Sequence, residues 1–116
     1  MSTNTIDPLV IVRLNEQTDV RGIPLGMVRG YEPGDTLVPA VLFRHPVEKS
    51  EAGIAAALEQ VWELLNVGDD PTFMNPPSPV ALRYRAKGCR SLSVGDVVEV
   101  FDARYAVARF GFQRLN

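Results

Sequence analysis

The side chains best suited to covalent chemistry in this sequence are its single cysteine and single histidine, Cys89 and His45. Cys89 lies among basic residues, and cations close to a cysteine favour the thiolate, which is the nucleophilic form. A Cys–His pair is therefore one hypothesis, in which the chain is a cysteine-dependent enzyme. The simpler interpretation is an incidental cysteine in a basic loop and a histidine that ends a strand before Pro46. We expect no enzymatic activity.

Other arrangements of reactive side chains are missing from the sequence. Ser91 and Ser93 lie outside a Gly-x-Ser-x-Gly elbow. One histidine and one cysteine are too few for a zinc site. Neither a phosphate-binding loop nor a dinucleotide fingerprint occurs. The sequence therefore predicts no catalytic residue, no metal and no cofactor.

Basic residues gather in the C-terminal part of the chain, although the formal net charge of the whole is −2. Residues 80–116 hold seven basic and three acidic side chains, whereas residues 1–79 hold five and eleven. Arginine and lysine neutralise phosphates, and a tyrosine among them stacks on an unpaired base. We therefore predict a nucleic-acid-binding surface. Its residues are Arg83, Tyr84, Arg85, Lys87, Arg90, Arg104 and Arg109.

Two other interpretations of the charges stay open. The arginines could be the solvated side of an edge strand, where charge opposes aggregation. Alternatively, the strand that contains Pro39, or the acidic helix face with Glu51, Glu59 and Glu63, could bind a host protein by strand addition or surface docking. A salt-sensitive association favours nucleic acid, and a salt-tolerant, stoichiometric one favours a protein partner.

The stretch GCRSLSVGDVVEV, residues 88–100, joins the basic region to a valine-rich strand. Gly95 allows a backbone conformation that is costly for other residues, and Asp96 can bond to neighbouring amides. Ser91 and Ser93 can bond to the backbone and fix the entry to the turn. These four residues are therefore predicted to be structural, and Gly95→Val is expected to loosen or unfold the domain.

The longer pattern RSLSVGDVVEV (90–100), followed by YAVARFGFQRL (105–115), resembles the C-terminal signature of the YodL-like domain family. The helix ending WELLN (62–66) is similar to that family's helix. The resemblance covers residues 50–115. It implies a small cytoplasmic bacterial protein of plasmids, integrative elements or phages, with accessory roles such as conjugation support or countering host defence. It implies no established activity.

The elements that must position these residues follow from hydrophobic patterning. Residues 8–14 and 36–45 are apolar runs typical of strands, and Pro39 indicates an edge strand or a bulge. Residues 21–35 predict a loop with a short strand near Met27–Val28. Two further segments complete the pattern: residues 80–86 predict a short strand, and residues 96–115 a β-hairpin that turns near Asp102–Ala103.

One helix is predicted to begin after Ser50 and to end near Asn66. Apolar residues recur at helical spacing and give the helix one face to pack on a sheet. They are Ile54, Leu58, Val61, Trp62 and Leu65. Residues 71–79, with four prolines, predict a stiff connector.

The chain has 116 residues, which suits a single domain that buries one core without disulfides. The sequence shows no signal peptide and no apolar run long enough to cross a bilayer, so we predict a cytoplasmic protein without membrane contact. The predicted fold is α+β over residues 1–116. It has one amphipathic helix on a curved, mostly antiparallel sheet that ends in a C-terminal β-hairpin. Trp62, Val97 and Phe110 are predicted core residues.

Overall fold

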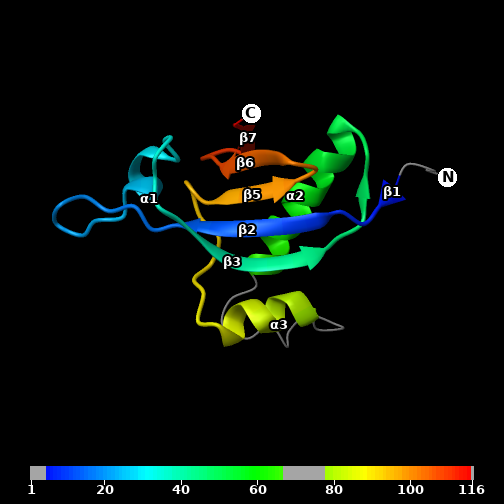
Figure 1. The fold of residues 1–116 in the computed structure, drawn as a ribbon, viewed down its shortest axis with the longest axis horizontal. Coiled ribbons are helices and arrows are strands. Elements are labelled where there is room, and N and C mark those ends of the chain that lie inside the picture. Colours follow the sequence, from blue (N-terminus) through cyan, green and yellow to red (C-terminus); the bar gives the residue numbers. More distant parts are fainter. Residues whose placement is uncertain (1–4, 67–77, 116) are drawn as a thin grey trace.

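The computed structural model describes residues 5–66 and 78–115 (Figure 1). A five-stranded antiparallel sheet forms its centre, in the order β3-β2-β5-β6-β7. The strands are β2 Leu9–Asn15, β3 Leu37–Arg44, β5 Val97–Val100, β6 Ala103–Val107 and β7 Phe112–Arg114. Two short strands, β1 Thr5–Ile6 and β4 Val47–Glu48, pair with each other. The predicted α+β class is confirmed.

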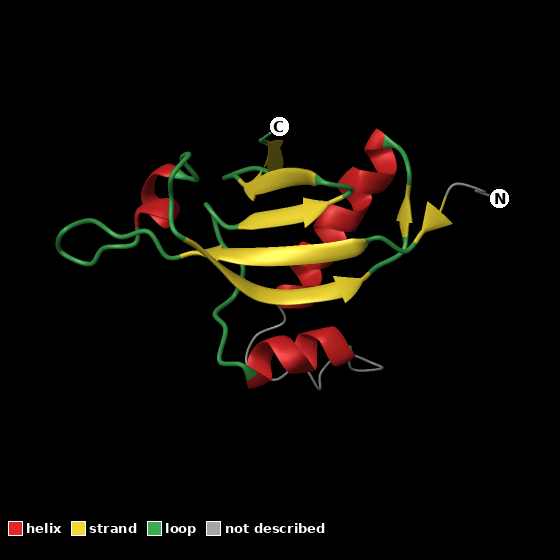
Figure 2. Ribbon diagram, in the orientation of Figure 1, coloured by secondary structure: helices red, strands yellow, loops and turns green. Residues whose placement is uncertain are grey.

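Helix α2, Glu51–Leu65, crosses one face of the sheet and leaves the other face uncovered by it (Figure 2). It begins where the sequence predicts, because the side chain of Ser50 accepts a hydrogen bond from the Gly53 amide at 2.9 Å. Its apolar face packs on alternate strand residues to form the core. The buried members include Leu58, Val61 and Leu65 of the helix and Val10, Val12, Phe43, Val98, Val100 and Tyr105 of the sheet.

The three predicted core residues have different environments. Val97 is fully buried, and Trp62 is half-buried against the core. The prediction for Phe110 is wrong, since this residue is 94% exposed. It lies at the tip of the β6–β7 turn, which the Ala108 amide closes by donating to the Gly111 carbonyl. A turn this tight holds its central side chain away from the core.

Strand β3 lies at one edge of the sheet, as Pro39 predicts. The register of β3 on β2 shifts where Val12 pairs with Val41 and Arg13 pairs with Pro39, so Ala40 is the extra residue of a bulge. The proline therefore sits where the ladder is already interrupted. The carbonyl of the bulge residue Ala40 accepts a hydrogen bond from Lys87, which follows the next helix along the chain.

Residues 80–86 do not form the predicted strand. They belong to helix α3, Pro79–Ala86, in which Ser78 caps the first turn by accepting from the Ala81 amide at 3.4 Å. Ala81 and Tyr84, three positions apart, are the buried residues of this helix. The predicted connector falls on residues outside the described part, apart from Ser78 and Pro79. In Figure 1 the helix runs beside β3, with which it makes tertiary contacts.

The glycine-rich segment also differs from its prediction. In place of a strand near Met27–Val28 it forms a short helix, α1, Leu25–Arg29, which ends at Gly30 with a φ of +81°. A C-terminal hairpin is confirmed for β5 and β6, which are joined by Phe101 and Asp102 at φ values of 53° and 61°. The turn thus comes one residue earlier than predicted, and its two positive φ values are those of a type I′ turn. The second predicted strand is divided into β6 and β7, which pair with each other.

Candidate functional site

The carboxylate of Asp96 is the centre of the loop that carries the sequence signature. Asp96 is fully buried and accepts four hydrogen bonds. Both terminal nitrogens of Arg90 donate to it at 2.7 Å, and the amides of Asn15 and Ser93 donate at 2.7 and 2.8 Å. The bond to Asp96 raises the pKa of the Arg90 guanidinium. These bonds fill the positions at which a carboxylate accepts, so the predicted structural role of Asp96 has a clear physical basis.

Gly95 lies where two backbone segments meet. Its φ is +96°, and a Cβ at this position would lie 2.7 Å from the Cα of Gly26 in α1. The close approach lets the side chain of Asn15 donate to the Gly95 carbonyl at 3.1 Å. Two contacts therefore join the loop to its neighbours. Gly95 packs against Gly26 of α1, and the side chain of Asn15, at the end of β2, bonds to the Gly95 carbonyl.

A second arginine–aspartate pair continues this polar cluster toward the surface. Asp35 accepts from Arg29 at 2.9 Å, from the Glu32 amide at 3.0 Å and from the Asn15 side chain at 2.9 Å. The Arg29 guanidinium, followed by these further donors, holds the pKa of the Asp35 carboxyl well below its usual range, against the opposing effect of burial. The side-chain amide of Asn15 donates to Asp35, and its backbone N–H donates to Asp96.

The lowered pKa of Asp35 predicts an acid-dependent loss of stability. A carboxyl whose pKa is depressed in the folded state contributes stability that is fully present above its unfolded pKa of about 4 and is lost as the pH falls toward the folded value. We expect Asp35→Asn to be less stable than the wild type at pH 7, with a difference that shrinks below about pH 4. Urea unfolding at successive pH values measures this, and a pH-independent difference contradicts it.

Four of the predicted nucleic-acid contacts make hydrogen bonds within the protein, although Lys87 and Arg90 stay exposed. Tyr84 is fully buried and its hydroxyl donates to the Arg90 carbonyl, while burial raises its pKa to about 12. Arg85 donates to the Leu65 carbonyl at the end of α2 at 3.0 Å, and Lys87 donates to the carbonyl of the bulge residue Ala40. Arg90 is held by Asp96. The prediction that Tyr84 stacks on a base is wrong, because its ring is not at the surface.

The other three predicted residues do not form one patch. Arg83 is exposed on α3, beside the β3 edge of the sheet. Arg104 is half-buried on β6, with its guanidinium 5.9 Å from the ring centre of Tyr31. Arg109 is exposed on the β6–β7 turn, near the opposite edge. A basic surface built from the C-terminal residues alone is therefore not what the fold presents.

The face of the sheet away from α2 is exposed beside β3, whereas Val97 and Ala106 on the same face are buried. This face gathers cations from both halves of the chain. Directly opposite residues of antiparallel strands share a face, so the pairings define its rows. One row joins Leu42, Ile11, Glu99 and Arg104; the neighbouring rows hold Arg44 opposite Leu9 and Arg13 opposite Pro39. We call Leu9, Ile11, Arg13, Leu42, Arg44, Glu99 and Arg104 the open sheet face.

Helix α3 adds a basic rim to this face. A hollow of about 250 Å³ lies between them, with Ile11, Pro39 and Leu42 on the sheet side and Arg83 and Lys87 on the helix side. Leu42 is 57% exposed, so its side chain is available to a ligand in the hollow. Of the predicted residues, the fold thus brings Arg83, Lys87 and Arg104 to the open sheet face or its rim.

Sequence reasoning missed Arg13 and Arg44 as members of this surface. Their signal is the two-residue period of a strand, in which Leu9, Ile11 and Arg13 alternate with the buried valines. Counting charges along the chain does not reveal this surface, because Arg13 and Arg44 both lie in residues 1–79, which are acidic overall.

Cys89 and His45 have separate structural surroundings. The His45 ring shares a hydrogen bond of 2.7 Å with the Gln60 side chain and meets Phe43 edge-on. Cys89 is half-buried against the core. In residues 5–66 and 78–115, no three His, Cys, Asp or Glu side chains are grouped as a metal site. The helices described are too short or too polar to cross a membrane.

Comparisons with known proteins give the chain no relative. No protein-family model, curated protein or solved structure matches it significantly.

Proposed function

We propose that this chain is a non-enzymatic binding module that holds a single-stranded nucleic acid on the open sheet face. The observation that carries the proposal is the charge of this surface. Arg13, Arg44 and Arg104 lie on it and Arg83 and Lys87 border it, against the one carboxylate of Glu99. Five cations on one side of a molecule with a net charge of −2 give it a strongly uneven field.

The apolar side chains among the cations of this face favour a single strand over a duplex. Ile11 and Leu42 lie side by side between the cations and offer an apolar surface to unpaired bases. Sheet faces that bind single strands stack the bases on aromatic side chains and contact the phosphates with basic side chains. Base contact here rests on aliphatic side chains, which predicts weak and sequence-tolerant binding.

The salt bridge within the face moderates the attraction. Arg13 lies 3.6 Å from Glu99, and both side chains are about one-quarter exposed, at 27% and 25%. Partial neutralisation lowers the contribution of Arg13 to phosphate binding. Arg44 and Arg83, which are exposed at the β3 side, are therefore the residues whose reversal should matter most.

The resemblance to the YodL-like domain family supplies the biological setting of the proposal. A cytoplasmic accessory protein of a plasmid, integrative element or phage meets single-stranded intermediates during transfer and replication. A small binding module is compatible with that role.

The test is a salt titration of binding to labelled single-stranded oligonucleotides of DNA and RNA. We expect affinity to fall as salt rises, with a logarithmic slope of about −0.7 per phosphate contacted. Arg44→Glu/Arg83→Glu should reduce the steepness of that slope by roughly 1.4, because two contacts are lost. The matched control is Arg21→Glu/Lys49→Glu, which has the same net charge but changes exposed residues outside the face.

Two results would contradict the proposal. The first is no binding to any oligonucleotide at low salt. The second is an equal loss of affinity in both double variants, which would mean that net charge and not the open sheet face is responsible. A salt-tolerant protein partner would then be the better hypothesis.

A further inference from the structure

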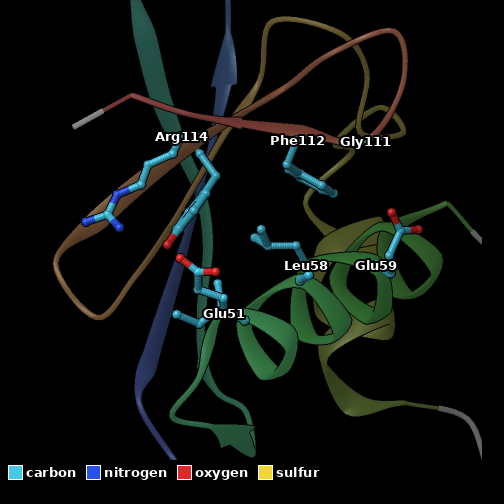
Figure 3. Close-up of a pocket in the computed structure, with 9 residues that line it drawn as sticks. Glu51, Leu58, Glu59, Gly111, Phe112 and Arg114 are labelled. Atoms are coloured by element: carbon cyan, nitrogen blue, oxygen red, sulfur yellow. The ribbon is translucent and has the colours of Figure 1, made fainter.

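A groove lies on the other side of the molecule, between α2 and the β7 edge of the sheet (Figure 3). It consists of two adjoining hollows of about 360 and 310 Å³ that share Glu59, Gly111 and Phe112. The helix wall comes from positions three and four apart along α2. These are Glu51, Ile54, Ala55, Leu58, Glu59 and Trp62.

The strand wall of the groove is the second edge of the sheet. Strand β7 pairs with β6 on one side, and no described strand pairs with its other side. The Ala108 amide bonds to Gly111 and the Leu115 amide to Arg104, so inward-facing backbone groups alternate along this segment. Phe112 lies between the inward-facing positions and directs its amide and carbonyl toward the open edge. Its side chain lines the groove at the same time.

The charges along the groove are arranged by wall. Glu51 and Glu59 belong to the helix side and Arg114 to the strand side, as Figure 3 shows. Arg109 adds a second cation on the strand side, in the adjoining hollow. Leu58 and Phe112 lie between them and make the floor apolar. A ligand that lies along β7 would therefore meet carboxylates on its helix-facing side, and lysine or arginine is the complement of such a wall.

The dimensions match a short extended chain. The helix wall from Glu51 to Trp62 is about 16 Å long at a rise of about 1.5 Å per residue. An extended peptide of about five residues covers this length at roughly 3.3 Å per residue. Alternate side chains of such a strand point to one face, so two or three of them reach the groove floor.

We propose that this groove binds an extended basic–apolar peptide segment of a protein partner, added to the sheet as a strand beside β7. The peptide backbone pairs with Phe112, an apolar side chain packs on Leu58 and Phe112, and a lysine or arginine pairs with Glu59. Strand addition of this kind takes its affinity from the main chain and its specificity from alternate side chains. The site lies on the face of the sheet opposite the open sheet face and is independent of nucleic-acid binding.

The experiment uses an array of terminally blocked seven-residue peptides. Threonine occupies the odd positions, and leucine, valine, phenylalanine, lysine or glutamate the even ones. We expect binding by peptides that combine an apolar residue with lysine, and at least a fivefold weaker affinity when glutamate replaces that lysine. In ¹H–¹⁵N spectra the shifted amides should include Phe112 and those of the facing turn of α2. Methylating the peptide amide that faces Phe112 should abolish binding.

A charge reversal separates the groove from general electrostatics. Glu59→Lys should shift the preference from lysine peptides to glutamate peptides, whereas Glu63→Lys, an exposed change on the same helix outside the groove, should leave it unaltered. The proposal is overturned if no peptide binds, if Glu59→Lys and Glu63→Lys behave alike, or if the shifted amides lie elsewhere. Self-association through β7 that lysine peptides do not displace, seen as a doubled mass in sedimentation, also overturns it.

Discussion

An alanine at position 95 is expected to lower the free energy of unfolding by about 2–5 kcal/mol. Roughly 1–2 kcal/mol comes from a positive φ that alanine adopts poorly, and about 1–3 kcal/mol from overpacking. The overpacking is severe because the new Cβ would lie 2.7 Å from the Cα of Gly26, and backbone cannot rotate away as a side chain does. The total free energy of unfolding of a small domain is only about 5–15 kcal/mol. Gly95→Val should therefore leave little folded protein.

The control for this substitution is Gly34→Ala. Gly34 has a φ of +94°, nearly that of Gly95 at +96°, but a Cβ there would meet no atom within 4 Å. The free energy of unfolding of Gly34→Ala should fall only by the cost of the positive φ, about 1–2 kcal/mol. Thermal and urea unfolding of the two variants measure the difference. Equal losses would mean that the contact between Gly95 and Gly26 does not constrain the fold.

Replacing Asp96 with asparagine is expected to cost roughly 3 kcal/mol or more. The substitution keeps the shape of the side chain but removes its charge and turns one acceptor into a donor. The new NH₂ group of the asparagine would face the N–H groups that donate to the carboxylate in the wild type. These belong to the guanidinium of Arg90 and the backbone of Asn15 and Ser93. Removing the charge of the buried carboxylate leaves the donors that converge on it without compensation, although the Arg90 side chain is 40% exposed.

Two measurements check this expectation. Asp7→Asn, a change at an exposed position, is the control and should unfold within about 0.5 kcal/mol of the wild type. Hydrogen exchange of the Asn15 amide reports the local effect, since that amide donates to Asp96. An Asp96→Asn variant with wild-type stability and a still-protected Asn15 amide would show that the carboxylate does not organise the loop.

The parts of the fold that the sequence predicts are those with strong local signals. Helix α2 has Ser50 as a cap and a long apolar period, and the structure places both its ends at the expected residues. Pro39 predicts the edge position of β3 because the lost donor of proline is a local property. The turn at Gly95–Asp96 was likewise readable from residue types alone.

Helix α3 was mistaken for a strand because its residues carry two periods at once. Val80, Leu82 and Tyr84 alternate with polar or small residues, which is typical of a strand, yet the buried residues are Ala81 and Tyr84. The Ser78–Pro79 pair, a cap followed by proline in the first turn, was the signal that favours a helix. A short amphipathic segment is decided by such end signals and by its packing partner.

The candidate site was less predictable because its charges depend on distant partners. Lys87 bonds to a carbonyl 47 residues earlier and Arg85 to one 20 residues earlier, and no local pattern reveals either acceptor. Arg90 differs, since its partner Asp96 lies only six residues away in the same loop. The spacing of an arginine and an aspartate around a tight turn was therefore a usable sign of a structural pair.

The two edges of the sheet have unequal access, and this limits how copies of the chain can assemble. At β3, Pro39 has no amide to donate, Lys87 occupies the Ala40 carbonyl, and α3 lies alongside. At β7 no comparable cover exists among the described residues. Two molecules that met through β7 would form a closed pair whose outer ends are both blocked. The architecture therefore terminates sheet polymerisation after one step and protects the protein from growing into fibres.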